Sequence, residues 1–128
     1  MTGTTIRFIA TIICAGMLAS CTAIPLASTD EDLEAKTFAV RPDKAKIYLY
    51  RDQSFGFAFP MTVTLTGRAT ARTVGQTYLV WEVDPGSYEL TSYAEDTSTL
   101  RLNTEAGKAY YVWQEVKLGF WKARSLLH

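Results

Sequence analysis

The stretch TYLVWEVDPGSYEL, residues 77–90, decides the fold class of this chain. Residues 77–83 are rich in β-branched and aromatic side chains, which favour extended strands. After them, Tyr88 and Leu90 alternate with polar residues, which is the period of a strand with one buried face. The Asp-Pro-Gly-Ser sequence at 84–87 lies between the two runs, and Pro followed by Gly is typical of a tight turn. The stretch therefore predicts two strands joined by a turn.

The same alternation of apolar and polar residues recurs on both sides of this stretch. Breaks near Gly67, Gly75 and Gly107 separate the runs at spacings near ten residues, which favours antiparallel neighbours. We therefore expect an all-β fold, a small antiparallel β-sandwich or partly open barrel of about six or seven strands. Residues 119–127 fit either a strand or a short helix. The further alternating runs are 46–51, 61–66, 99–103 and 110–116.

Composition narrows the class of protein. A chain of 128 residues has room for one domain, and 48% apolar with 20% charged residues argues against disorder. Thirteen basic and thirteen acidic side chains cancel, so there is no basic footprint for nucleic acid.

The N-terminus reads as a targeting segment. Arg7 precedes an apolar run over residues 8–19, which is too short to span a bilayer comfortably. The run ends in Leu18-Ala-Ser-Cys21, which resembles the bacterial lipobox. In that motif the thiol of the cysteine, here Cys21, takes a diacylglyceryl group. Cleavage of the peptide bond before Cys21 then leaves a lipidated N-terminal cysteine. An ordinary secretory signal or a buried helix are the alternatives, and residues 23–27 offer only weak cleavage sites.

Lipidation would anchor the mature chain, because two or three acyl chains hold a protein stably in a membrane. Thr22 stands where Gram-negative lipoproteins of the inner membrane commonly have Asp, so the analogy favours the outer membrane, periplasmic face. Cys14 lies in the discarded signal, so the mature body keeps no thiol for a disulfide, a metal site or a nucleophile.

Three parts follow along the chain: a signal peptide at 1–20, a lipidated tether at 21–43 and a β-sandwich-like domain at 44–128. The tether contains the acidic run 30–34. An anionic membrane surface would repel this run and so hold the domain away from the lipid. The run also fits one turn of helix with acids near its N-terminus, which the helix dipole favours. The two interpretations are compatible.

Several phrases fall in a familiar order: KAKIYLYR at 44–51, TYLVWEV at 77–83, DPGSYEL at 84–90 and EAGKAYYV at 105–112. Together with the lipobox, they resemble the domain-of-unknown-function 2846 family of bacterial lipoproteins. The resemblance implies a small β-sandwich-like domain of the cell envelope. It brings no established activity and no catalytic residues.

Catalytic signals are weak in this sequence. The single histidine, His128, is the last residue, and we expect it to be a frayed end. No histidine is therefore placed to act in a Ser-His-Asp triad or to bind a metal. We expect no enzyme activity, no cofactor and no metal. Two carboxylates for a hydrolase remain the weakest alternative, since scattered acids on strand ends are usually solvated. The acids concerned are Asp43, Asp52, Glu82, Asp84, Glu89 and Glu95.

The aromatic residues are the most informative feature left. Most must fill the core, but alternation leaves open whether Tyr48 and Tyr50 or Ile47 and Leu49 face outward. The same choice holds between the pair at 111 and 113 and the pair at 110 and 112. An outward row of Tyr and Trp suits a protein or a glycan. The candidate partner-binding residues are Tyr48, Tyr50, Phe55, Phe57, Tyr111, Trp113 and Trp121.

These observations favour a membrane-anchored envelope lipoprotein with a non-catalytic β domain. That domain would bind a protein or glycan of the envelope or serve a structural role. The alternative is a periplasmic inhibitor or immunity-type module that acts on an enzyme through the loop at 52–60, with Phe55, Phe57 and Phe59.

Overall fold

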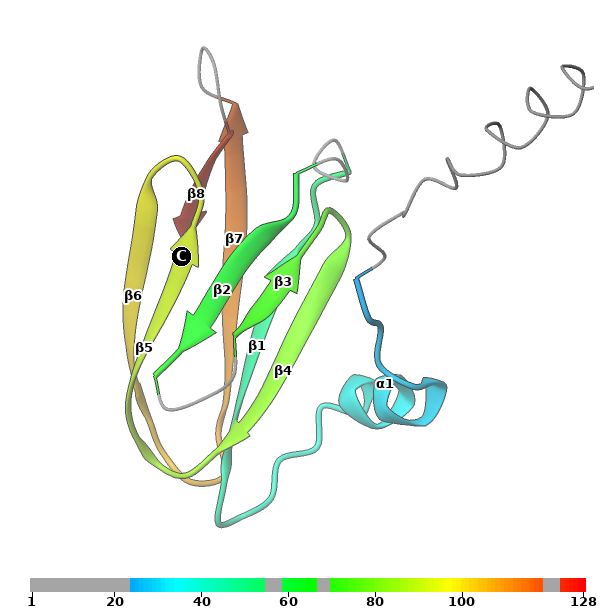
Figure 1. Ribbon diagram of the computed structural model, residues 1–128. Helices are drawn as coiled ribbons and strands as arrows, with labels where there is room; N and C mark the ends of the chain where they lie inside the picture. Colours follow the sequence, from blue (N-terminus) through cyan, green and yellow to red (C-terminus); the bar gives the residue numbers. More distant parts are fainter. Residues whose placement is uncertain (1–23, 55–58, 67–69, 119–122) are drawn as a thin grey trace, which may run out of the picture.

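The computed structural model describes residues 24–54, 59–66, 70–118 and 123–128 (Figure 1). These residues form one short helix and eight strands, so the prediction of an all-β fold is confirmed with slightly more strands than expected. The elements are α1 (Thr29–Lys36), β1 (Ala45–Arg51), β2 (Met61–Leu65), β3 (Ala71–Thr73), β4 (Thr77–Val83), β5 (Gly86–Tyr93), β6 (Thr97–Thr104), β7 (Ala109–Leu118) and β8 (Ala123–Leu127).

The strands build two four-stranded sheets, in the orders β4-β1-β7-β8 and β3-β2-β5-β6. The two sheets pack as the layers of a sandwich, visible in Figure 1. Neighbours pair antiparallel, as expected, except β1 and β7, which run parallel with Leu49 opposite Val112. A parallel pair needs a crossover connection, and here the chain between β1 and β7 builds the whole second sheet and β4. At the C-terminus, β8 pairs with β7, so a strand rather than a helix forms there.

The turn predicted at 84–87 connects β4 and β5, but these strands belong to different sheets. It is therefore a corner between the layers and not a hairpin. Gly86 opens β5, and its N–H donates to the Thr104 hydroxyl at 3.2 Å. A local turn signal marks where the chain reverses, whereas the pairing of β4 with β1 depends on residues about thirty positions upstream.

The core lies between the sheets and settles which side of β1 and β7 faces inward. Ile47 and Leu49 are fully buried, and Val112 of β7 is buried opposite Leu49. Tyr48 and Tyr50 therefore point to the outer face of their sheet, since successive side chains alternate. The buried apolar cluster consists of Ala45, Ile47, Leu49, Val63, Leu65, Val83, Leu90, Val112 and Leu127.

A polar network closes one end of this core. The Gln114 side chain is fully buried. It accepts a hydrogen bond from the Thr73 hydroxyl at 2.6 Å and donates to Ser92 at 2.8 Å and Ser125 at 3.2 Å. The network ties β7 to β3, β5 and β8, and it satisfies groups whose burial without partners would be costly.

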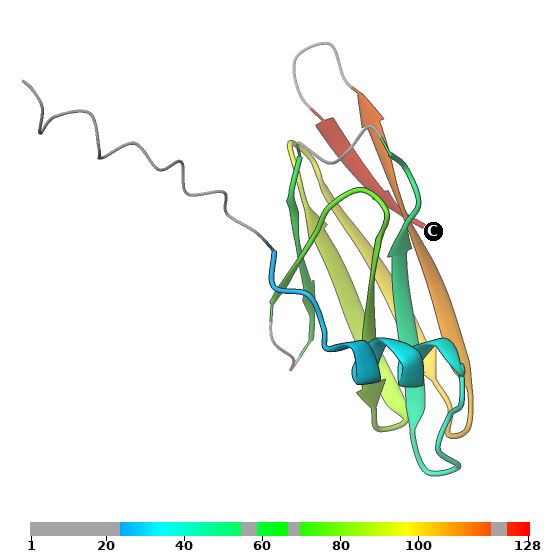
Figure 2. The same ribbon diagram turned by 90° about the vertical axis from the view of Figure 1, so that its right-hand side faces the viewer.

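The acidic run forms the helix α1. Ser28 caps it: the Glu31 N–H donates to the Ser28 hydroxyl at 3.3 Å, and the Ser28 N–H donates to the Glu31 carboxylate at 2.9 Å. The helical interpretation of this run is thus confirmed. Figure 2 shows α1 lying across the outer face of the β4-β1-β7-β8 sheet. Within the described ranges, no helix is long and apolar enough to cross a membrane.

Candidate functional site

The outer face of the β4-β1-β7-β8 sheet gathers aromatic side chains from three strands. Register places Tyr50 of β1 between Tyr78 of β4 and Trp113 of β7. One step along, Tyr48 lies opposite Tyr111. Paired residues of neighbouring strands point to the same face, so these five rings share one surface. We call Tyr48, Tyr50, Tyr78, Tyr111 and Trp113 the aromatic face.

Two rings of the aromatic face stack on each other, and a third ring from outside the sheet packs against them. Tyr48 and Tyr111 stack with centroids 5.2 Å apart and planes 17° apart, and Phe38 tilts over them at 5.4 and 6.2 Å. Tyr48 is only 4% exposed, whereas Tyr111 is 56% and Phe38 54% exposed. Tyr48 therefore supports the surface from below, and the exposed rings packed against it are accessible to a ligand.

A hollow of about 310 Å³ opens between this face and α1. Its walls are the four tyrosines of the aromatic face, Phe38, and Ala35 and Lys36 of α1. Aromatic rings offer large apolar area with a polar handle, which is why Tyr and Trp are common where one protein binds another molecule.

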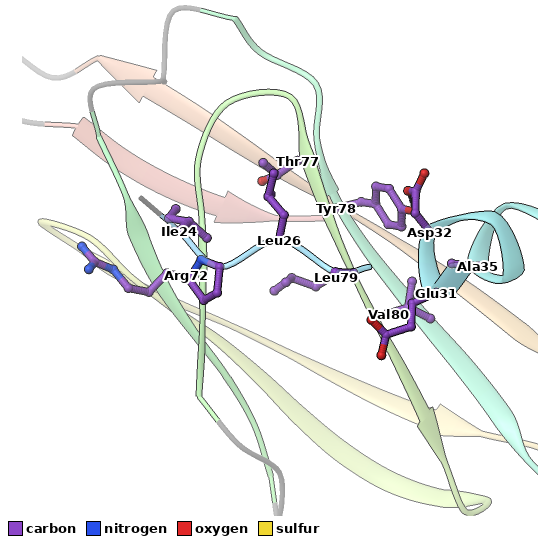
Figure 3. Close-up of a pocket in the computed structure, with 12 residues that line it drawn as sticks. Ile24, Leu26, Glu31, Asp32, Ala35, Arg72, Thr77, Tyr78, Leu79 and Val80 are labelled. Atoms are coloured by element: carbon purple, nitrogen blue, oxygen red, sulfur yellow. Dashed lines mark hydrogen bonds between the residues drawn. The ribbon is translucent and has the colours of Figure 1, made fainter. Parts of the chain in front are cut away.

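A second cleft, of about 490 Å³, adjoins the hollow along β4 (Figure 3). The segment 24–27 forms one side, and residues 77–80 of β4 form the other. Ala35 and Tyr78 line both this cleft and the hollow, and Figure 3 shows Tyr78 beside Asp32. The two hollows thus form a continuous surface on the side where the segment before α1 approaches the sandwich.

Hydrogen bonds join α1 to the aromatic face. The Tyr48 hydroxyl donates to the backbone carbonyl of Ala35 at 3.0 Å, and the Tyr78 hydroxyl donates to the Asp32 carboxylate. The Lys36 ammonium and then the Tyr78 hydroxyl lower the pKa of Asp32 by stabilising its charged form. In return, the hydrogen bond to Asp32, followed by burial, raises the pKa of Tyr78 to about 12.

Trp113 ends the row at the β8 side. Its indole N–H donates to the Asp52 carboxylate at 3.0 Å, and its ring lies 5.5 Å from that of His128. The His128 backbone N–H and C=O both pair with Trp113 at 3.1 Å. The expectation that His128 is a frayed end is therefore wrong, because backbone pairing continues past β8.

Four of the predicted binding residues, Tyr48, Tyr50, Tyr111 and Trp113, come together on this face. Sequence reasoning missed two others, Tyr78 and Phe38. Tyr78 shows only after β4 is paired with β1, and Phe38 reaches the face because its backbone turns into the left-handed region, with φ of 56°. Phe59, in the 52–60 loop, is 46% exposed. Cys21, Phe55, Phe57 and Trp121 lie outside the described residues.

Four of the candidate carboxylates, Asp43, Glu82, Asp84 and Glu89, lie in ion pairs, and Asp43 and Glu82 share Arg41 as their partner. Asp43 lies 2.9 Å from Arg41, and Glu89 lies 3.3 Å from Arg101. Asp84, in the β4–β5 corner, pairs with Lys44. In the part of the chain that the structure describes, no three His, Asp or Glu side chains gather as a metal site would require.

Comparison with known proteins identifies the family. The family model described as "Protein of unknown function (DUF2846)" matches residues 41–125, about two thirds of the chain. The chain belongs to this family. All five residues of the aromatic face lie inside the matched range of the DUF2846 domain, whereas α1 and Phe38 precede it.

One curated relative is an uncharacterized protein of Haemophilus influenzae. It is 27% identical over 106 residues, which cover 80% of this chain and 62% of the relative. The chain thus spans less than two thirds of the length of that relative. The comparisons establish a DUF2846 domain over residues 41–125 of this chain.

Proposed function

We propose that this protein is a lipid-anchored protein of the bacterial envelope whose β-sandwich is a non-catalytic binding module. The observation that carries the proposal is the aromatic face, where strands distant in sequence place five rings on one side of the sheet, with Tyr50, Tyr78 and Tyr111 exposed. Exposed apolar patches of this kind commonly mark interaction sites. The partner is a protein or a glycan of the envelope, and the balanced charge gives no reason to expect nucleic acid.

The lipobox supports the anchor. Residues 24–27, which follow Cys21 closely in the sequence, lie beside β4 of the sheet that carries the aromatic face. Acyl groups on Cys21 would therefore hold the aromatic face a short distance from the membrane. Thr22 favours the outer membrane, with the domain on the periplasmic side.

The binding surface is tested by crosslinking in living cells with a tagged full-length chain. The variant Tyr50→Ala/Tyr111→Ala removes two exposed rings of the aromatic face. Its matched control is Tyr93→Ala, because Tyr93 is 47% exposed on the other sheet. We expect a discrete partner, protein or glycan, to be captured by the wild type and by Tyr93→Ala but lost from the double variant. Equal capture by all three forms would refute the aromatic face as the binding surface.

The anchor is tested separately with Cys21→Ala. Metabolic labelling with a fatty acid should mark the wild type and not this variant, which should accumulate as an unprocessed precursor. Normal labelling and processing of Cys21→Ala would refute lipidation, and this result would not affect the binding surface.

A further inference from the structure

The aromatic face is already occupied by a segment of the chain itself. Residues 24–38, which we call the strap, run along β4 and across the outer face of the sheet (Figure 2). Three groups of the strap contact the face, at a regular spacing of three residues. They are the carboxylate of Asp32, the backbone carbonyl of Ala35 and the ring of Phe38.

Each group has a matching partner on the face. Asp32 accepts a hydrogen bond from the hydroxyl of Tyr78, and Ala35 accepts one from the hydroxyl of Tyr48. Phe38 packs on the stacked pair of Tyr48 and Tyr111. The strap therefore shows which chemistry this surface recognises: an anion, a carbonyl and an aromatic ring at successive steps along a short peptide.

The strap is held by these few contacts. None of the residues of α1 is buried, and Leu33 is 59% exposed on it. An eight-residue helix is marginal in water unless its surroundings stabilise it. Phe38 adopts a left-handed backbone conformation that bulky residues avoid, and its ring remains half exposed. Such a segment can be displaced without opening the core of the sandwich.

We propose that the strap is a built-in ligand that a partner protein displaces by presenting the same groups, a carboxylate followed six residues later by an aromatic ring. The proposal rests on the aromatic face as the binding surface and names the chemistry of its partner. A ligand that competes with a tethered segment binds only those molecules in which the segment is undocked. Its apparent association constant is therefore the intrinsic constant multiplied by the undocked fraction. Displacement would also lengthen the link to the anchor, since residues 21–44 extended would reach about 80 Å.

The test uses a synthetic peptide that copies residues 28–40, STDEDLEAKTFAV. Its binding to the full-length protein in detergent is measured by calorimetry. The protein is compared with Asp32→Asn/Phe38→Ala, which removes two of the three docking groups and leaves the aromatic face intact. The matched control is Leu33→Ala, which truncates an exposed side chain of the same helix. Thermal unfolding shows whether each variant keeps its folded sandwich.

We expect the peptide to bind the double variant about tenfold more tightly than it binds the wild type or Leu33→Ala. A peptide with Ala in place of the residue that corresponds to Phe38 should bind at least tenfold more weakly. Adding Tyr111→Ala to the double variant should abolish binding.

Equal affinity for the wild type and the folded double variant would overturn the proposal, as would binding that survives Tyr111→Ala. Absence of peptide binding to the double variant would overturn it as well. Tighter binding of soluble peptidoglycan fragments after strap removal, without peptide binding, would assign the face to a glycan. In that case the aromatic face would remain the binding surface, and only the strap as a built-in ligand would be refuted. Equal crosslinking in cells by the wild type and Tyr50→Ala/Tyr111→Ala would refute both the binding surface and the built-in ligand.

Discussion

The hydroxyl of Tyr48, in the middle of β1, donates a 3.0 Å hydrogen bond to the backbone carbonyl of Ala35 near the end of α1. The same carbonyl accepts the N–H of Phe38 at 3.1 Å. A carbonyl has two lone pairs, so one oxygen both ends the helix and fixes it to the sheet. The contact joins the segment that leads to the predicted anchor with the surface that we propose binds a partner.

Tyr48→Phe removes this hydrogen bond and keeps the ring. We expect the strap to open more often, so that trypsin cleaves after Lys36 several-fold faster in native conditions. The free energy of unfolding should fall by no more than about 1 kcal/mol, the usual net contribution of one hydrogen bond. Tyr93→Phe, on the other sheet, is the control. An unchanged cleavage rate in Tyr48→Phe would show that the hydroxyl does not hold the strap.

The Asp32–Tyr78 contact gives strap docking a defined range of pH. The lowered pKa of Asp32 favours its charged form, so its contribution is present above the ordinary pKa of the carboxyl group and is lost as pH falls. The raised pKa of Tyr78 favours the neutral hydroxyl. That contribution is present below about pH 10, the ordinary pKa of tyrosine, and is lost as pH rises through about 12. Docking should therefore be strongest at neutral pH.

Ultraviolet titration of the tyrosines measures this effect directly. In the wild type, Tyr78 should ionise near pH 12, above the ordinary pKa of a tyrosine. In Asp32→Asn, the carboxylate that stabilises the neutral hydroxyl is gone, so this late step should move down toward the ordinary range. A titration curve identical in both proteins would contradict the hydrogen bond.

The buried network around Gln114 should make the largest polar contribution to stability. Gln114→Leu leaves the hydroxyls of Thr73, Ser92 and Ser125 without their amide partner, and we expect the free energy of unfolding to fall by about 2–4 kcal/mol. Ser92→Ala removes one partner only, so its loss should be about 1 kcal/mol. Urea denaturation of both variants checks the order, and a greater loss in Ser92→Ala would contradict it.

Gly107 allows the chain to enter β7. Its φ is 75°, and its N–H donates to the carbonyl of Lys44 at 2.7 Å. A Cβ atom at this position would lie 3.9 Å from the carbonyl oxygen of Pro42, an ordinary contact. Gly107→Ala should therefore cost about 1 kcal/mol through backbone conformation alone, and the β-branched Gly107→Val should cost more. Equal stability of all three forms in urea would show that the turn relaxes freely.

Local signals in the sequence determined much of this protein. Alternation of apolar and polar residues located six of the strands, and Asp-Pro-Gly-Ser located the β4–β5 corner. Ser28 followed by Glu31 is a capping pattern that also marks the start of α1. These features depend on residues within a few positions of one another, so one chain is enough to read them.

The tertiary structure alone decided which faces are covered and which residues meet. Alternation separates Tyr48 from Ile47 but does not say which side is buried, because burial depends on where the second sheet packs. The parallel pairing of β1 with β7 brings Tyr48 to Tyr111, and the pairing of β1 with β4 adds Tyr78. The candidate site thus arises from contacts between residues up to 63 positions apart, whose pairing is set by the packing of the whole sandwich.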